Sequence, residues 1–181
     1  MTKGQVKDRL ASAEKRLNDL LALNRGNLPG ANASERQQLV QEFFFHLIGT
    51  IDVLAQVVND VKALGLDSED VSVPAVIKRL GSTDPAVTPL AAVHVKTRGM
   101  SVPGDPYSDD ALLFRAYNYR HQVTHRGTNP FLFRVGSLPP TSFHLDPRNT
   151  GLGHSTKAAQ DEMRQMLQLI SMRCDAVLAL I

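Results

Sequence analysis

Arginine and histidine side chains are concentrated in residues 117–126, near the end of a predicted helix. Arg120, His121 and His125 follow one another closely there. The arginine guanidinium is a planar fork of donors that matches phosphate oxygens. Histidine accepts and returns a proton near neutral pH, because its unperturbed pKa lies in that range. Together these groups can bind and cleave a phosphodiester.

Positive charge surrounds this segment, although the whole chain is almost neutral. The whole chain carries 20 Lys and Arg against 18 Asp and Glu, so its net charge does not favour binding to nucleic acid or to a membrane. Residues 111–145, in contrast, contain no acidic residue. Here Arg115 and Arg126 would contact RNA phosphates, Asn118 would donate to a phosphate, and Tyr117 would stack on a base. Each assignment has an alternative. The arginines can belong to a solvated basic helix end, Asn118 can face solvent, and Tyr117 can simply pack in the core.

Metal and cofactor chemistry find little support in the sequence. His121 and His125 are four residues apart and therefore share one helix face. Their neighbourhood lacks a third Cys, Asp or Glu ligand, so we expect neither a metal nor another cofactor. The single cysteine, Cys174, excludes an internal disulfide and falls on the apolar stripe of the last helix. We expect a buried structural thiol in a reducing compartment.

The sequence also indicates where the protein resides. Residues 1–16 alternate charges and have no apolar signal core, so no secretory signal is visible. The most apolar run, 43–58, contains His46 and Asp52 and is too short to span a bilayer. We therefore expect a soluble, cytoplasmic protein without a membrane partner.

Apolar residues at helical spacing predict four substantial helices. They cover residues 4–24, about 34–64, 108–126 and 155–181. The most compact arrangement is an all-α, four-helix antiparallel bundle, and the length of the chain favours a single domain over residues 1–181.

Two connections complete this plan. Residues 66–107 are rich in proline and predict a long loop between the second and third helices, with one short helical piece at 74–80. Before the last helix, residues 131–135 and 141–145 predict a small hairpin, against which Pro139-Pro140 argues.

Three successive aromatic residues mark the second helix. Phe43, Phe44 and Phe45 cannot all face one core from a single helix, because successive residues diverge by about 100°. Part of this aromatic surface should therefore meet another element or a second subunit.

The segment from Arg120 to His125 resembles the Arg-x4-6-His signature of the HEPN superfamily, in which a polar residue, here His121, commonly follows the arginine. Its position on the third long helix of a four-helix plan is similar as well. The resemblance implies metal-independent RNA cleavage at a homodimer interface. It makes His125 the acid/base, gives phosphate binding to Arg120 and lets His121 assist.

The geometry of the helix sets a requirement for RNA cleavage by these residues. Arg120 and His125 diverge by roughly 140° around an ideal helix, so a loosened helix end or a second copy must bring both to one phosphate. We expect an endoribonuclease of a toxin or phage-defence type, restrained by an antitoxin or another regulatory protein. Two alternatives stay open: a non-catalytic module that binds RNA or a nucleotide, and a protein-interaction module in which both residues are structural.

Overall fold

The computed structural model describes residues 1–24, 33–95, 104–125, 131–133, 141–149 and 153–181. These residues contain six α-helices and one two-stranded hairpin. In chain order the elements are α1 (Lys3–Asn24), α2 (Ala33–Val61), α3 (Val73–Leu80), α4 (Val87–Ala92), α5 (Asp109–His125), β1 (Phe131–Phe133), β2 (Thr141–Phe143) and α6 (Ala159–Leu178). The prediction of an all-α protein is confirmed.

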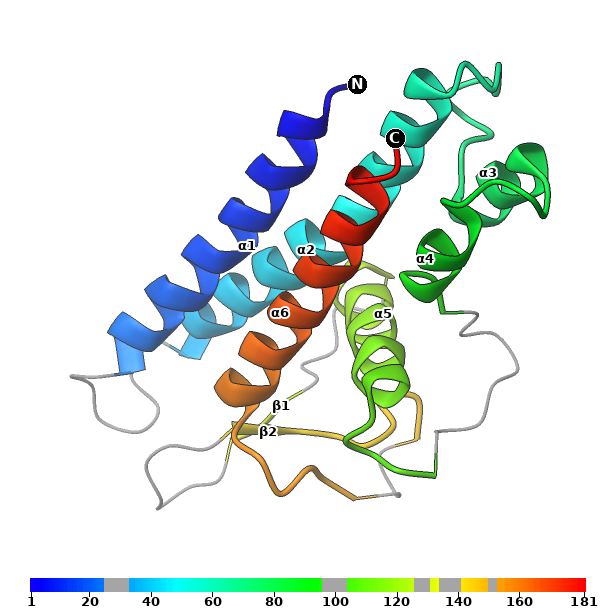
Figure 1. The fold of residues 1–181 in the computed structure, drawn as a ribbon. Coiled ribbons are helices and arrows are strands. Elements are labelled where there is room, and N and C mark those ends of the chain that lie inside the picture. Colours follow the sequence, from blue (N-terminus) through cyan, green and yellow to red (C-terminus); the bar gives the residue numbers. More distant parts are fainter. Residues whose placement is uncertain (25–32, 96–103, 126–130, 134–140, 150–152) are drawn as a thin grey trace.

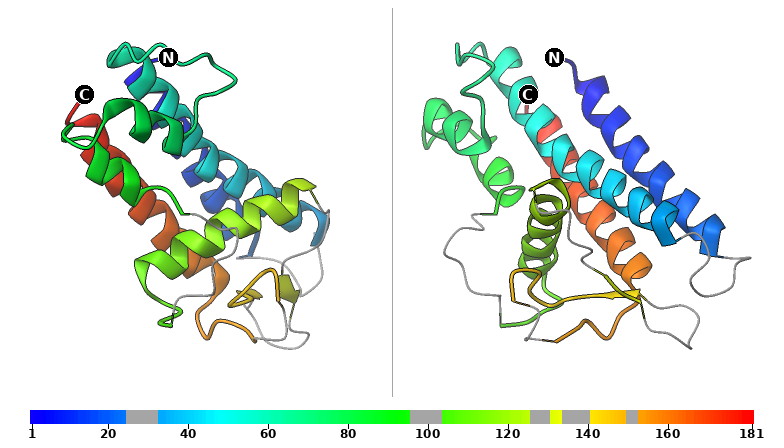
Figure 2. Two further views of the ribbon diagram at one scale, coloured as in Figure 1. Left: turned by 90° about the vertical axis from the view of Figure 1, so that its right-hand side faces the viewer. Right: turned by 180° about the vertical axis from the view of Figure 1, so that it is seen from behind.

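The four long helices do not all run along one axis. α1, α2 and α6 lie side by side, whereas α5 crosses α2 and α6 obliquely (Figures 1 and 2). α1 runs antiparallel to α6, since the side chain of Lys3 donates to the carbonyl of Leu178 at 3.0 Å. α5 is therefore packed against α2 and α6 at an angle, with its C-terminal half directed past α2.

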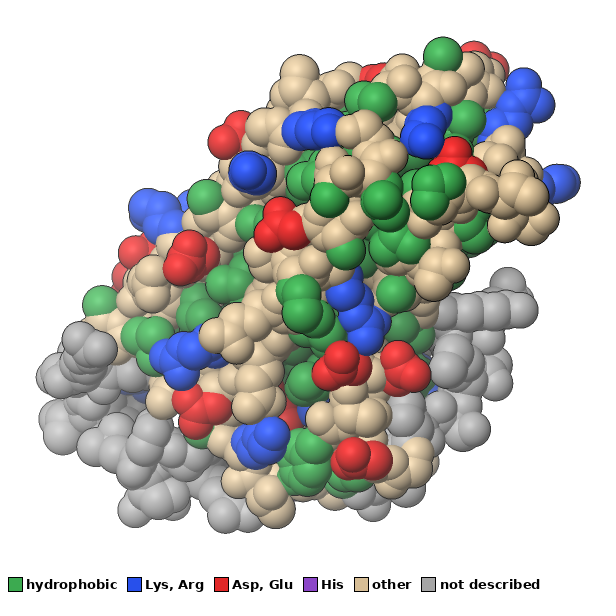
Figure 3. Space-filling model, viewed as in Figure 1, with side chains coloured by type: hydrophobic (Ala, Val, Ile, Leu, Met, Phe, Trp, Pro, Cys, Tyr) green, Lys and Arg blue, Asp and Glu red, His purple; other side chains and the backbone are tan. Residues whose placement is uncertain are grey.

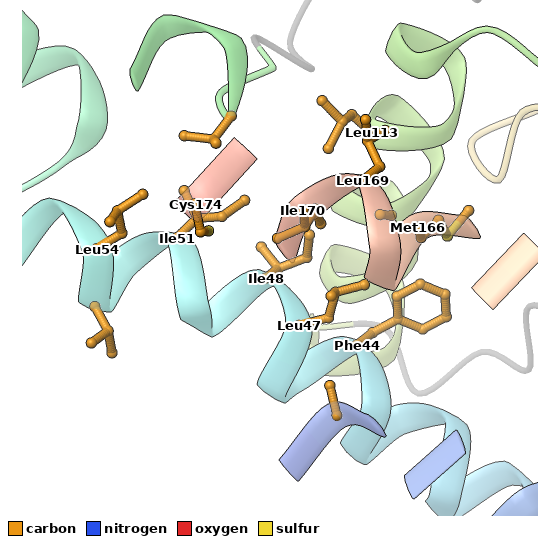
Figure 4. Close-up of a cluster of buried hydrophobic side chains, with 14 of the residues drawn as sticks. Phe44, Leu47, Ile48, Ile51, Leu54, Leu113, Met166, Leu169, Ile170 and Cys174 are labelled. Atoms are coloured by element: carbon orange, nitrogen blue, oxygen red, sulfur yellow. The ribbon is translucent and has the colours of Figure 1, made fainter. Parts of the chain in front are cut away.

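α2 carries the centre of the hydrophobic core. Figure 4 shows Phe44, Leu47 and Ile48 of this helix facing Met166 and Ile170 of α6, and all five side chains are fully buried. The apolar residues of α2 recur at helical spacing, so one continuous stripe faces α6 and α5. Burying this stripe is the main force that joins the three helices.

Cys174 and two of the three successive phenylalanines are buried in this hydrophobic core. Cys174 is a buried free thiol, as predicted, and burial raises its pKa to about 12. Phe43 and Phe44 lie inside, whereas Phe45 is 48% exposed. The expectation that the three phenylalanines diverge is therefore confirmed.

One described helix, Ser34–Val61, is long and apolar enough to cross a membrane by length and composition. Of its most apolar window, 67% is buried inside the protein. The helix extends beyond the apolar run 43–58 at both ends, so the argument from the length of that run does not apply to it.

The segment 66–107 contains more helix than the sequence predicts. α3 matches the expected piece at 74–80, and Ser72 caps it by accepting the N–H of Ala75 at 3.4 Å. α4 was not expected, because the proline-rich composition of 66–107 predicts a loop outside the piece at 74–80. Pro89 lies in the first turn of α4, however, where no backbone N–H donor is needed.

The predicted hairpin is present. β1 and β2 pair antiparallel, with Phe131 opposite Phe143 and Phe133 opposite Thr141. Phe143 is fully buried and lies against Tyr119 of α5, with ring centroids 4.5 Å apart. The hairpin thus covers one side of the helix that carries the Arg and His residues.

Candidate functional site

α5 begins with the signals that the sequence predicts. The Ser108 hydroxyl accepts the N–H of Ala111 at 3.3 Å, and Asp109 and Asp110 place negative charge at the positive end of the helix dipole. From this start the helix continues to His125. The segment 120–125 therefore forms its last turn and a half.

Arg120 lies at the surface between α5 and α2. Its Nη1 atom is 2.9 Å from Oδ2 of Asp52, and the two side chains are 30% and 65% exposed. Within the described residues, Asp52 is the carboxylate that forms an ion pair with Arg120. An exposed pair of this kind is worth about 0 to 1 kcal/mol, so a phosphate can compete with Asp52 for the guanidinium.

The two histidines of the motif are described to different extents. His121 is exposed on α5 next to Arg120. His125 is the last residue of the helix, and its side chain lies outside the described part of the structure. Arg126, predicted as a phosphate contact, also lies outside the described residues.

Arg115 is not at the surface, so its predicted contact with RNA is corrected. The side chain is fully buried, and its Nη2 is 3.0 Å from Oε1 of Glu162 on α6. Its Nη1 donates to the carbonyl of Pro106, and Ser155 donates to the same Glu162 oxygen at 2.6 Å. Burial raises the pKa of the Glu162 carboxyl, while Arg115 and Ser155 lower it. This buried pair joins α5 to α6.

Asn118 and Tyr117 also have structural partners. Asn118 is buried and donates from Nδ2 to the carbonyl of Phe114 at 2.8 Å. The hydroxyl of Tyr117 donates to the carbonyl of Val93 at 3.2 Å, and burial raises the pKa of this phenol. The ring of Tyr117 lies edge-on to His94. Core packing, the alternative left open for Tyr117, describes its position better than a base platform, and Asn118 does not reach a phosphate on the surface.

A second group of surface residues lies beside Arg120. Phe45 and Asp52 are seven residues apart on α2 and share its outer face, because seven residues make about two turns. The guanidinium of Arg9 on α1 lies 5.3 Å from the centre of the Phe45 ring. A surface strip, exposed at Phe45 and Asp52 and partly buried at its ends, therefore runs from Arg9 across Phe45 and Asp52 to Arg120. The sequence signals Phe45 through the aromatic run, but Asp52 only as a charge that interrupts an apolar stretch.

The charges on the face that Figure 3 shows do not form a single basic surface within the described residues. On the described part of the face in Figure 3, Lys and Arg side chains are interspersed with Asp and Glu. In the part of the chain that the structure describes, no group of three or more His, Cys, Asp or Glu side chains could hold a metal ion. Comparisons with protein-family models, with curated proteins and with solved structures found no match.

Proposed function

We propose that the protein is a metal-independent endoribonuclease of the HEPN type, a single domain whose four long helices form the bundle of that superfamily. The observation that carries the proposal is the position of Arg120 in the last turns of α5. Its guanidinium is partly exposed and is held by one exposed carboxylate, that of Asp52. An incoming phosphate can replace that carboxylate at low cost.

The proposed reaction uses the chemistry of the RNA itself. His125 removes the proton of a 2'-hydroxyl, whose oxygen attacks the neighbouring phosphorus. The bond from phosphorus to the 5'-oxygen breaks, and that oxygen takes up the proton that His125 returns. Arg120 offsets the negative charge that develops on the phosphate oxygens, and His121 assists it. By resemblance to the superfamily, the products are a 2',3'-cyclic phosphate and a 5'-hydroxyl end.

A homodimer is part of this proposal. Arg120 and His125 diverge around the helix, so two copies facing each other supply both groups to one phosphate. Phe45 supports a contact on this side, because it is a large apolar side chain exposed on the same surface strip as Arg120. We further propose a cytoplasmic toxin or defence role, with an antitoxin or regulatory protein as restraint.

A helical module without catalysis is the second candidate. Its protein-interaction form is favoured by the interior positions of Arg115 and Asn118, which leave α5 with fewer surface groups for RNA than the sequence predicts. In that case the contact between Arg120 and Asp52 is a structural link between two helices, and the strip around Phe45 binds RNA or another protein.

The test is incubation of the purified protein with total RNA in the presence of EDTA. We expect the wild type to cleave, and His125→Ala and Arg120→Ala to lose at least about 100-fold in rate, the usual weight of a positioned acid/base. Arg164→Ala is the matched control, since Arg164 is also a surface arginine in an exposed ion pair, with Asp161.

Circular dichroism and light scattering would first establish that all variants fold and have the same oligomeric state. Direct labelling of the products by polynucleotide kinase would identify the expected 5'-hydroxyl ends. Equal cleavage by wild type and both motif variants would refute the assignment of the site. RNA binding without turnover, by a folded wild type, would support the second candidate instead.

A further inference from the structure

Two histidines outside the proposed catalytic motif face each other across paired backbone segments. His144 and His154 form an isolated antiparallel bridge. The hydrogen bonds on either side run from Leu145 N to Gly153 O, at 3.0 Å, and from Ser155 N to Phe143 O, at 2.8 Å. The two histidines therefore occupy a non-hydrogen-bonded position of the pair. Side chains approach most closely at such positions, where the Cα atoms are about 4.5 Å apart.

The imidazole rings are in contact but leave polar atoms unsatisfied. Their centroids are 4.2 Å apart, with an angle of 48° between the ring planes. The Nδ1 atoms of both rings are buried and have no hydrogen-bond partner. Buried polar atoms almost always have a partner, and an ion or a water molecule is one explanation of an unpaired one. Here two such atoms belong to neighbouring rings.

We propose that His144 and His154 together bind a divalent transition-metal ion of the zinc, copper or nickel group. Imidazole nitrogen suits these ions, whereas Mg²⁺ and Ca²⁺ prefer oxygen. Two nitrogens at 2.0–2.1 Å from a tetrahedral zinc ion lie about 3.3 Å apart, a separation of the same order as the 4.2 Å between the ring centroids.

The site has two protein ligands within the described residues, since no third His, Cys, Asp or Glu joins them. Water completes the coordination, so the ion is exchangeable and EDTA removes it. The proposed RNA cleavage uses no metal in its chemistry, so either proposal can fail without the other.

The position of the pair determines what the ion does. The carbonyl of His144 accepts the hydroxyl of Tyr119 on α5 at 3.1 Å, and Gln122 of α5 donates to Pro147 in the connection between the two histidines. A metal ion bound by both histidines links the two ends of this connection, at His144 and His154. It thereby fixes the segment that contacts α5 at Tyr119 and Gln122, on either side of Arg120 in the sequence, and it stabilises the folded state by binding only that state.

The experiment uses the full chain, treated with EDTA and then freed of chelator. Zinc is added while the melting temperature and the heat of binding are recorded. We expect one ion per chain, and a rise in Tm of roughly 5 to 10 °C when free zinc reaches about 100 times its Kd. Mg²⁺ at the same concentration should leave Tm unchanged.

His144→Gln and His154→Gln should each abolish the stabilisation. The matched control is His94→Gln, because His94 is another partly buried histidine, lying against Tyr117 rather than near the pair. Zinc should stabilise this control as much as the wild type. An equal effect in all four proteins, or no binding by the wild type, would overturn the proposal.

A measurement on the wild type alone covers the case in which the variants do not fold. Nitrogen-15 spectra of the imidazoles report directly on metal ligation. Zinc should shift the ring nitrogens of two histidines, assigned to His144 and His154. Shifts confined to other histidines would show that the ion binds elsewhere.

Discussion

Replacing Glu162 by glutamine tests the buried ion pair that holds α5 against α6. The substitution keeps the shape of the side chain and an oxygen that can accept from Ser155, but removes the negative charge. Arg115 then remains positively charged, fully buried and without its counter-ion. A charge in that position is costly, because the protein interior solvates it poorly.

The expected loss follows from the complete burial of both partners. Breaking a buried pair by changing one partner costs about 3 to 5 kcal/mol. Since glutamine keeps the hydrogen bonds, we expect about 3 kcal/mol, the lower end of that range. For a chain of this size, that corresponds to a decrease in Tm of roughly 6 to 12 °C.

The preceding residue provides a matched control. Asp161 also lies in the first turn of α6, and it pairs with Arg164 at 3.2 Å, but the two side chains are 53% and 48% exposed. Asp161→Asn makes the same chemical change at the same helix end and should cost no more than about 1 kcal/mol.

The assay is urea denaturation followed by circular dichroism for the wild type, both single variants and the double variant Arg115→Met/Glu162→Leu. The double variant removes both charges and should recover much of the stability that Glu162→Gln loses, since no buried charge remains. Equal losses for Glu162→Gln and Asp161→Asn would refute the reasoning, because burial would then make no difference.

Two further predictions concern charges at and near the surface. Asp52→Asn removes the carboxylate that competes for Arg120, and in a His125→Ala background it should tighten RNA binding up to about fivefold by fluorescence anisotropy; weaker binding would contradict this. Burial lowers the pKa of His46 and of His94 below the ordinary 6.5, so the folded state resists their protonation. The free energy of unfolding should therefore be highest above pH 6.5 and should decrease as the pH falls from 6.5 through the lower pKa values of the folded state. In urea titrations at pH 7.5 and 5.5, His46→Gln should show a smaller difference between the two pH values than the wild type.

Local sequence signals predict the long helices well, and one difference shows where they fail. The first two helices were expected at 4–24 and about 34–64 and are found at Lys3–Asn24 and Ala33–Val61. The last helix was expected to begin at Ser155, but it begins at Ala159. The hydroxyl of Ser155 donates to Glu162 and accepts the N–H of Lys157, so it serves the buried ion pair instead of a helix end. A capping pattern does not reveal such a competing partner.

The site was predictable only in part, because its partners come from distant segments. Arg115 and Arg120 look alike in the sequence, five residues apart on one helix. Glu162 of α6 makes the first a buried structural residue, and Asp52 of α2 holds the second at the surface. Helical spacing gives the direction of a side chain, but it does not say which element covers it.

Neighbouring elements cover much of α5 and limit which of its side chains can contact a ligand. α2 and α6 pack against this helix, Tyr117 joins it to Val93, and the hairpin segment covers Tyr119. Of the motif side chains that the structure describes, Arg120 and His121 remain open to solvent. A basic patch spread along α5 is therefore not available to RNA, and each arginine removed from the surface removes one phosphate contact and its share of the salt dependence. The proposed ribonuclease activity would thus depend on a few groups at the C-terminal end of α5, and a second copy or a specific RNA shape would have to supply the remaining affinity.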